Sequence, residues 1–142
     1  MKILVIDGQG GRIGRGVIEQ LKKGGFKGEI IAVGTNSSAT EAMMKAGADR
    51  GATGDNPVAV NAAEADIITG PVGIIAANSL MGEVTPRMAY SVAASRAKKV
   101  LIPMNRCKIV MAGTEELPLN EYISRAAQLI LEAEKQEQGG CV

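Results

Sequence analysis

A glycine-rich turn joins an apolar run to a helical pattern close to residue 1. The run Ile3–Ile6 is typical of a buried strand, and the apolar spacing from Ile13 to Leu21 is typical of a helix. Between them lies Asp-Gly-Gln-Gly-Gly-Arg-Ile-Gly, residues 7–14. A strand that enters a helix through glycines brings unpaired backbone N–H groups to the positive end of the helix dipole, where phosphates bind. The turn therefore predicts an α/β domain with a nucleotide site.

The rest of the chain continues this alternation of apolar runs and helical patterns, which is typical of a parallel sheet covered on both faces. We expect a Rossmann-like, doubly wound α/β fold with a mostly parallel sheet in the order 3-2-1-4-5-6. Four residues, Pro103–Arg106, separate the last two runs, too few for a parallel crossover, so the final strand is expected to be antiparallel and at an edge. The predicted strands are residues 3–6, 30–33, 50–52, 67–69, 100–102 and 108–111, and the predicted helices are 13–23, 38–47, a short one from 56, 85–98 and 119–137.

Short polar motifs mark where three of these helices should begin. Ser38, followed three residues later by Glu41, predicts a capping box at the second helix. The pairs Asn56-Pro57 and Thr85-Pro86 place a capping side chain before a proline in the first turn, and they predict the third and fourth helices.

Composition limits the chain to one domain and excludes several classes of partner. The 142 residues suffice for one core, which we assign to residues 1–137, with a disordered tail at 138–142. A net charge of +1 with scattered basic residues gives no reason to expect nucleic acid as a partner. Apolar runs are too short for a membrane span, and no signal peptide is evident, so a cytoplasmic location is expected. Two cysteines and no carboxylate cluster predict neither a disulfide framework nor a metal site.

The glycine spacing resembles that of known cofactor-binding families. Ile13 replaces the third glycine of the common dinucleotide fingerprint, but Gly8, Gly11 and Gly14 are spaced as in extended short-chain dehydrogenases. Residues 2–24 are similar to the opening of dihydrodipicolinate reductase. These resemblances imply that NAD or NADP is the cofactor. Over its whole length the chain resembles a family of short bacterial proteins catalogued as a domain of unknown function, which implies no activity. The cofactor-binding residues expected in the turn are Gly8, Gln9, Gly10, Gly11, Arg12, Ile13 and Gly14.

Two further loops are expected to border the cofactor. After the second strand, Thr35 and Asn36 stand where NAD-binding folds carry an acidic residue, and this favours NADP or a mononucleotide as much as NAD. After the fourth strand, Gly70, Pro71 and Val72 should face the first loop across the point where the strand order reverses. Alternatively, these loops are plain turns and helix caps. Asp7 is expected to accept hydrogen bonds from amides of its own loop, because a carboxylate would repel a pyrophosphate.

Catalysis has little support in the sequence. Histidine is absent, and Tyr90 is followed four residues later by Ala94 instead of the lysine of short-chain dehydrogenases. Glu83 and Arg87 are candidates for contact with a substrate, although both have ordinary roles in a loop or at a cap.

Three hypotheses for function follow. The first is a nucleotide-binding protein without a catalytic domain, the second a small oxidoreductase whose pocket a second copy completes, and the third an interaction protein with an empty loop. A homo-oligomer, most simply a dimer, is expected because residues 74–77 and 80–81 are more apolar than a loop beside a crevice requires. The alternative is that they form a short helix packed on the sheet of the same chain.

Overall fold

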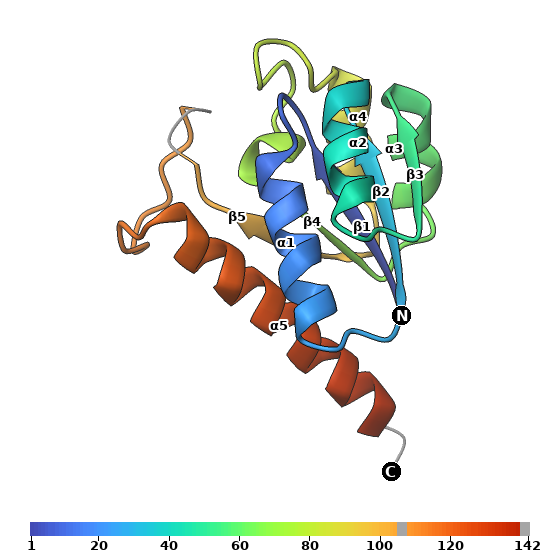
Figure 1. Ribbon diagram of the computed structural model, residues 1–142. Coiled ribbons are helices and arrows are strands. Elements are labelled where there is room, and N and C mark those ends of the chain that lie inside the picture. The colour runs from blue at the N-terminus through green and yellow to red at the C-terminus, as the bar shows by residue number, and fades with distance from the viewer. Residues whose placement is uncertain (105–107, 140–142) are drawn as a thin grey trace.

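The computed structural model describes residues 1–104 and 108–139, and its central element is a five-stranded parallel sheet (Figure 1). The strand order is β3-β2-β1-β4-β5, so the predicted order of the first five strands is confirmed. Strands β2 and β3 extend the sheet to one side of β1, and β4 and β5 extend it to the other. The switch point of the fold therefore lies between β1 and β4, beside the first loop. The strands are β1 (Lys2–Asp7), β2 (Glu29–Gly34), β3 (Arg50–Thr53), β4 (Ile67–Pro71) and β5 (Lys98–Ile102).

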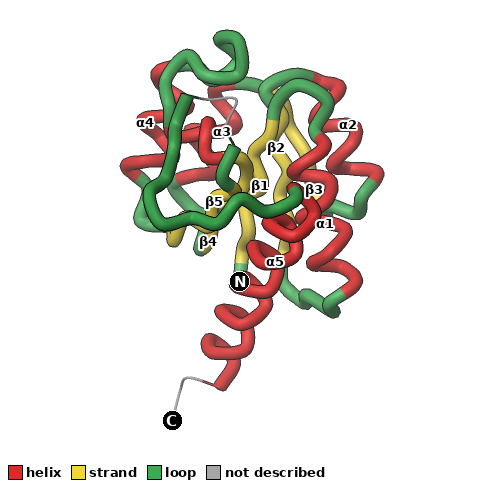
Figure 2. Tube along the Cα trace, turned by 90° about the vertical axis from the view of Figure 1, so that its left-hand side faces the viewer, coloured by secondary structure: helices red, strands yellow, loops and turns green. Residues whose placement is uncertain are grey.

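Helices cover both faces of the sheet (Figure 2). One face packs against α1 (Arg12–Lys23), α2 (Ser37–Lys45) and α5 (Leu119–Gly139), and the other against α3 (Asp55–Ala62), α4 (Pro86–Ala94) and the short 3-10 helix η1 (Val72–Ile75). Successive residues of β1 alternate between these two cores: Ile3 and Val5 face α1, whereas Leu4 and Ile6 face α3 and α4. The C-terminal part of α5 projects beyond the sheet (Figure 1).

The helix starts are partly as predicted. Thr85 caps α4 by accepting a hydrogen bond from the Met88 amide, and Pro86 occupies the first turn. At α2, however, the cap is Asn36, whose side chain accepts from the Ala39 amide, and not Ser38. At the third helix, Gly54 and not Asn56 is the residue before the first turn.

The predicted sixth strand is wrong. Residues 108–111 have no strand conformation, and residues 105 and 106 of the expected hairpin lie outside the described part of the chain. Lys108 has a φ of 54°, a left-handed conformation that interrupts an extended run. In addition, the edge strand β5 carries Lys98 and Lys99, and such lysines disfavour pairing with a further strand. The sheet is therefore all parallel, and β5 forms its edge.

Three other boundaries differ from the prediction. Helix α4 ends at Ala94, because the chain must extend to enter β5 at Lys98. Helix α5 continues to Gly139, two residues beyond its expected end at residue 137, and residues 140–142 lie outside the described part. Ile74 is buried in η1 against the sheet, which confirms the short-helix alternative for the start of the apolar segment 74–77. Within residues 1–104 and 108–139, no helix is both long and apolar enough to span a membrane.

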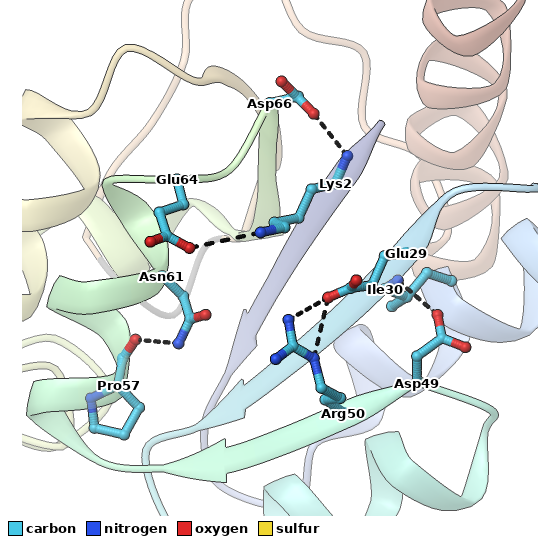
Figure 3. A network of polar contacts seen from close by, with 9 residues as sticks. All are labelled: Lys2, Glu29, Ile30, Asp49, Arg50, Pro57, Asn61, Glu64 and Asp66. Carbon is cyan, nitrogen blue, oxygen red and sulfur yellow. Dashed lines mark hydrogen bonds and ion pairs between the residues drawn. The ribbon is translucent and has the colours of Figure 1, made fainter.

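Polar contacts join the strands at their amino ends (Figure 3). The Lys2 amide donates to Asp66 Oδ2 at 2.7 Å, and the Lys2 ammonium lies 3.5 Å from Glu64 Oε2. Arg50 of β3 pairs with Glu29 of β2, which lies next to it in the sheet. The cations and carboxylates of this network neutralise one another. Because the pairs join specific residues at the strand ends, the network helps to fix the register of the strands.

Candidate nucleotide-binding cleft

The main cleft lies at the carboxyl ends of β1, β4 and β5, the position where open α/β sheets bind their ligands. Its volume is about 660 Å³, within the range of small-molecule sites, roughly 300–1,000 Å³. One side is the glycine-rich loop with the start of α1, and the base includes Pro71, the last residue of β4. The opposite side, here called the far wall, comes from residues 109–122.

The far wall supplies apolar surface and two carboxylates. Its apolar part includes Ile109, Met111 and Leu117, and the carboxylates are those of Glu115 and Glu116. An anionic group of a ligand is therefore expected at the glycine-rich loop, where Arg12 lies, and not at the far wall.

Tyr122 of α5 holds the far wall in place. Its hydroxyl donates to the Glu115 carbonyl and accepts from the Leu117 amide at 3.1 Å. Both polar functions of the phenol are therefore used inside the chain, while the residue still lines the cleft. The part of the far wall that precedes α5 is therefore attached to that helix through the Tyr122 hydroxyl.

Asp7 stands at the end of β1, and its carboxylate organises the loop that follows. Oδ1 accepts from the Gly8 amide at 2.8 Å and Oδ2 accepts from the Gly14 amide at 2.7 Å, which confirms its predicted role. Burial raises the pKa of Asp7, the amides of Gly14, Gly8 and Ile13 oppose this rise, and the nearby Glu83 charge adds to it. The helix-start amide of Gly14 is consequently occupied by the chain itself.

Internal packing explains why three positions of the loop are glycines, because a Cβ at each would overlap other atoms of the chain. A Cβ on Gly8 would lie 2.7 Å from Thr35 Oγ1 and 2.9 Å from Leu80 Cδ1. Gly11 has a φ of 72°, and a Cβ there would lie 2.8 Å from the backbone of Ala39 in α2. A Cβ on Gly14 would overlap Met43 Sδ of α2 and would lie 3.1 Å from the Asp7 Cβ.

Gly10 is different, because no atom lies within 4 Å of its ideal Cβ position and it lines the cleft. Among the hydrogen bonds between described residues, none is donated by the amides of Gly10 or Arg12. These two residues are therefore the part of the loop that is available to a ligand.

Glu83 lies at the end of the glycine-rich loop that is next to β2. Its Oε1 accepts hydrogen bonds from the Gln9 amide at 2.9 Å, from Thr35 Oγ1 at 2.6 Å and from Asn36 Nδ2 at 2.7 Å. The hydrogen bond from Thr35 is the largest cause that lowers the pKa of Glu83, and the Gln9 amide and Asn36 add to it while partial burial opposes it. The carboxylate is thus held in its ionised form beside the loop.

The structure brings only part of the predicted site together at the cleft. Thr35 and Asn36 instead face Glu83, Val72 is buried in η1, and Gly70 approaches the Ile6 carbonyl inside the sheet. The predicted residues that line the cleft are Gly8, Gln9, Gly10, Arg12, Ile13 and Pro71. Those that do not line it are Gly11, Gly14, Thr35, Asn36, Gly70 and Val72.

Sequence reasoning missed the far wall and the role of Glu83. The run at residues 108–111 predicts an edge strand, and an edge strand gives no reason to expect a wall of the cleft. For Glu83 there was one signal, since the segment around it is rich in polar residues, but its partners lie 47, 48 and 74 positions away along the chain. Local patterns do not reveal contacts at such separations.

Two solved structures match this fold. The first is described as a dodecameric FMN-dependent UbiX-like decarboxylase from Escherichia coli O157:H7, with 15% identity, a TM-score of 0.52 and coverage of 95% of both chains. The second is AibC, with 17% identity and a TM-score of 0.50. That match covers 92% of this chain but 39% of AibC, so the present chain spans about two fifths of that protein. At these identities the likeness shows the α/β fold alone.

The expectation of NAD or NADP is overturned by these comparisons. The structure matched over its whole length is described as FMN-dependent, and the resemblance of residues 2–24 to nicotinamide-dependent enzymes is not confirmed. The geometry offers a physical reason. A dinucleotide extends to both sides of the switch point, and here Glu83 occupies the side next to β2.

Sequence comparison assigns the chain to a family without assigning an activity. No curated protein matches it closely enough to count as a relative. Residues 2–135 match the family model described as "Domain of unknown function (DUF3842)", and the chain therefore belongs to that family.

Proposed function

We propose that this protein binds a mononucleotide in the cleft, and that flavin mononucleotide is the first ligand to test. The observation that carries the proposal is the position of the cleft, at the switch point of the sheet, with one open glycine and one arginine at its edge. A ligand there would present a phosphate to Gly10 and Arg12 and a flat ring to the far wall.

The loop end of the cleft fits a phosphate. Gly10 leaves space for a close approach to the backbone, and its amide and that of Arg12 face no internal acceptor among the described residues. No ion pair within the described part of the chain involves Arg12, whereas Arg15, three residues later, pairs with Glu19 at 2.8 Å. Arg12 can therefore bind a phosphate without losing an existing partner.

The far wall fits an aromatic ring. Ile109, Met111 and Leu117 offer apolar surface, and Met side chains adapt to flat partners. Tyr122 adds the edge of a phenol whose hydroxyl is already satisfied. The FMN dependence named for the structure with the same fold supports flavin as the ring, although likeness of fold does not by itself carry function.

Arg12→Gln and Arg15→Gln form a matched pair for the experiment. Both remove one guanidinium from the first turn of α1, but only Arg12 lines the cleft. The dissociation constant is measured by quenching of FMN fluorescence. Arg12→Gln should raise it about tenfold or more, as expected for a lost charged hydrogen bond, and Arg15→Gln should leave it unchanged. Equal effects of the two variants, or no quenching by the unmodified protein, would contradict the proposal.

We also propose that the protein acts as a homo-oligomer. Two exposed apolar side chains support this: Val110, which lines the cleft, is 87% exposed, and Met81, which follows the lining residue Leu80, is 95% exposed. A second copy could cover them, and the fold neighbour is described as a dodecamer. Light scattering should show more than one copy per particle, and Met81→Lys should lower that number. A monomer at tens of micromolar would refute the proposal.

A further inference from the structure

Three hydrogen-bond donors converge on one oxygen atom at the end of the glycine-rich loop that lies next to β2. They are the Gln9 amide, the Thr35 hydroxyl and the Asn36 side-chain amide, at 2.9, 2.6 and 2.7 Å from Glu83 Oε1. The donors come from the loops after β1 and after β2, the two strands that a dinucleotide crosses in related folds. Such a donor set is suited to an anion of any origin, including a phosphate.

The chain supplies that anion through a shaped loop, here called the strap, residues 76–85. The strap closes on itself through hydrogen bonds from the Asn78 amide to the Val84 carbonyl at 2.7 Å and from the Val84 amide to the Ser79 carbonyl at 3.2 Å. Asn78, Leu80 and Met81 have positive φ values of 66°, 54° and 58°, a conformation that side-chain-bearing residues seldom adopt.

Packing of the Leu80, Glu83 and Val84 side chains fixes the strained strap against the rest of the domain. Val84 is 1% exposed and is part of the core, while Leu80 and Glu83 fill the space above Gly8 that a Cβ would occupy. The contacts of the Leu80 side chain and the Glu83 carboxylate with the glycine-rich loop therefore compensate for the backbone strain of the strap.

We propose that the Glu83 carboxylate is a built-in anion that occupies a second anion-binding position and thereby restricts the cleft to ligands with a single nucleotide. The restriction to one nucleotide rests on the proposed function, whereas the anion-binding position does not. A ligand with a second nucleotide would need the donors that Glu83 holds. Glu83 is thus a residue that determines specificity.

The anion-binding position is tested without any nucleotide, using inorganic phosphate as the probe. In the unmodified protein, phosphate should not move the NMR resonances of the Thr35 backbone amide and the Asn36 side-chain amide, whereas binding at the proposed phosphate position would be reported by Gly10 and Arg12. In Glu83→Ala the three donors are released, and the Thr35 and Asn36 resonances should shift and saturate. Adding Thr35→Val to Glu83→Ala removes one donor to a charged acceptor and should weaken phosphate binding about tenfold.

Matched variants keep this test decisive. Glu41→Ala, which removes an exposed carboxylate that pairs with Lys45 along α2, should behave as the unmodified protein does. If Glu83→Ala does not fold, Glu83→Gln serves instead, because the amide retains an acceptor but loses the charge and should yield to phosphate at higher concentrations. A folded Glu83 variant in which phosphate leaves the Thr35 backbone and Asn36 side-chain amide resonances unchanged overturns the inference.

The selection of ligand length is tested with FMN and FAD, which differ by an adenylate group. The unmodified protein should bind FMN more tightly than FAD, and Glu83→Ala should reduce that preference at least tenfold. Equal affinity of the unmodified protein for both flavins would overturn the selection by Glu83. Absence of FMN binding, together with phosphate binding to Glu83→Ala, would refute the proposed function and leave the anion-binding position established.

Discussion

A single added methyl group should have opposite effects at two glycines of the same loop. In Gly8→Ala, the Cβ would lie 2.7 Å from Thr35 Oγ1, 2.9 Å from Leu80 Cδ1 and 3.2 Å from Glu83 Oε1. Thr35 and Glu83 are joined by a hydrogen bond of 2.6 Å, so they can give way only together. We expect Gly8→Ala to lower the free energy of unfolding by about 1–3 kcal/mol, the usual cost of overpacking.

Gly10→Ala meets no such obstacle. No atom lies within 4 Å of the Cβ position at Gly10, and its φ is not in the left-handed region. Alanine reduces the conformational freedom of the unfolded chain, so the free energy of unfolding should rise by about 0.4–1 kcal/mol.

Both changes are measurable by urea unfolding and by thermal melting. For 142 residues the entropy of unfolding is about 0.3 kcal/mol/K, so each kcal/mol shifts Tm by about 3 °C. The melting temperature should therefore fall by about 3–10 °C for Gly8→Ala and rise by about 1–3 °C for Gly10→Ala, with equal urea m-values. If both variants lose the same stability, the packing explanation of Gly8 is refuted, because the two positions would then be equivalent.

Two further changes test buried polar groups. Thr69 is 0% exposed and its hydroxyl has no hydrogen-bond partner among the described residues, so Thr69→Val should raise the free energy of unfolding by about 1–2 kcal/mol in urea titrations. A loss of stability would mean that the hydroxyl is satisfied. Because burial raises the pKa of Asp7 in the folded state, the folded protein disfavours the ionised carboxylate, and stability present at acidic pH is lost as the pH rises through the raised pKa. Asp7→Asn does not titrate, so its stability relative to the unmodified protein should increase from acidic to neutral pH. A constant difference across that range would contradict the assignment.

The order of the sheet could be predicted from sequence because buried parallel strands leave a strong signal. Runs such as Ile3–Ile6 and Ile67–Thr69 are apolar on both faces, and the helical patterns between them set the crossovers. The edge was predicted wrongly because an apolar run of four residues is ambiguous by periodicity. Tertiary structure decided that case, since Lys108 adopts a left-handed conformation and Val110 remains exposed.

The cap of α2 shows a similar limit at smaller scale. Asn36 and Ser38 both have suitable side chains, and Glu41 favours Ser38 as part of a capping box. Asn36 caps instead, and its amide nitrogen also donates to the Gln9 carbonyl at 3.0 Å and to Glu83. Those contacts with distant residues add to the local preference, and no window of sequence around α2 contains them.

The site was visible in sequence only where it is local. The loop after β1 and its helix start were recognised, and half of the residues expected to bind a cofactor line the cleft. The far wall and the strap approach from residues 76–122, far along the chain. One indication was nevertheless present: the acidic residue typical of the end of β2 is missing, and Glu83 places a carboxylate beside that same position.

A glycine in such a loop is evidence for a ligand only where the space that a side chain would occupy is open to the cleft. Gly8, Gly11 and Gly14 share a spacing with cofactor-binding families, but the atoms that fill their Cβ positions belong to Thr35, Ala39 and Met43 of this chain. The same spacing would therefore be required if the protein bound nothing, because it allows β1, α1 and α2 to approach closely. Gly10, the second glycine of the common dinucleotide fingerprint that Ile13 leaves incomplete, is the loop glycine open to the cleft. The proposed phosphate position therefore lies at Gly10 and Arg12, and the ligand-binding test uses Arg12 instead of Gly8, Gly11 or Gly14.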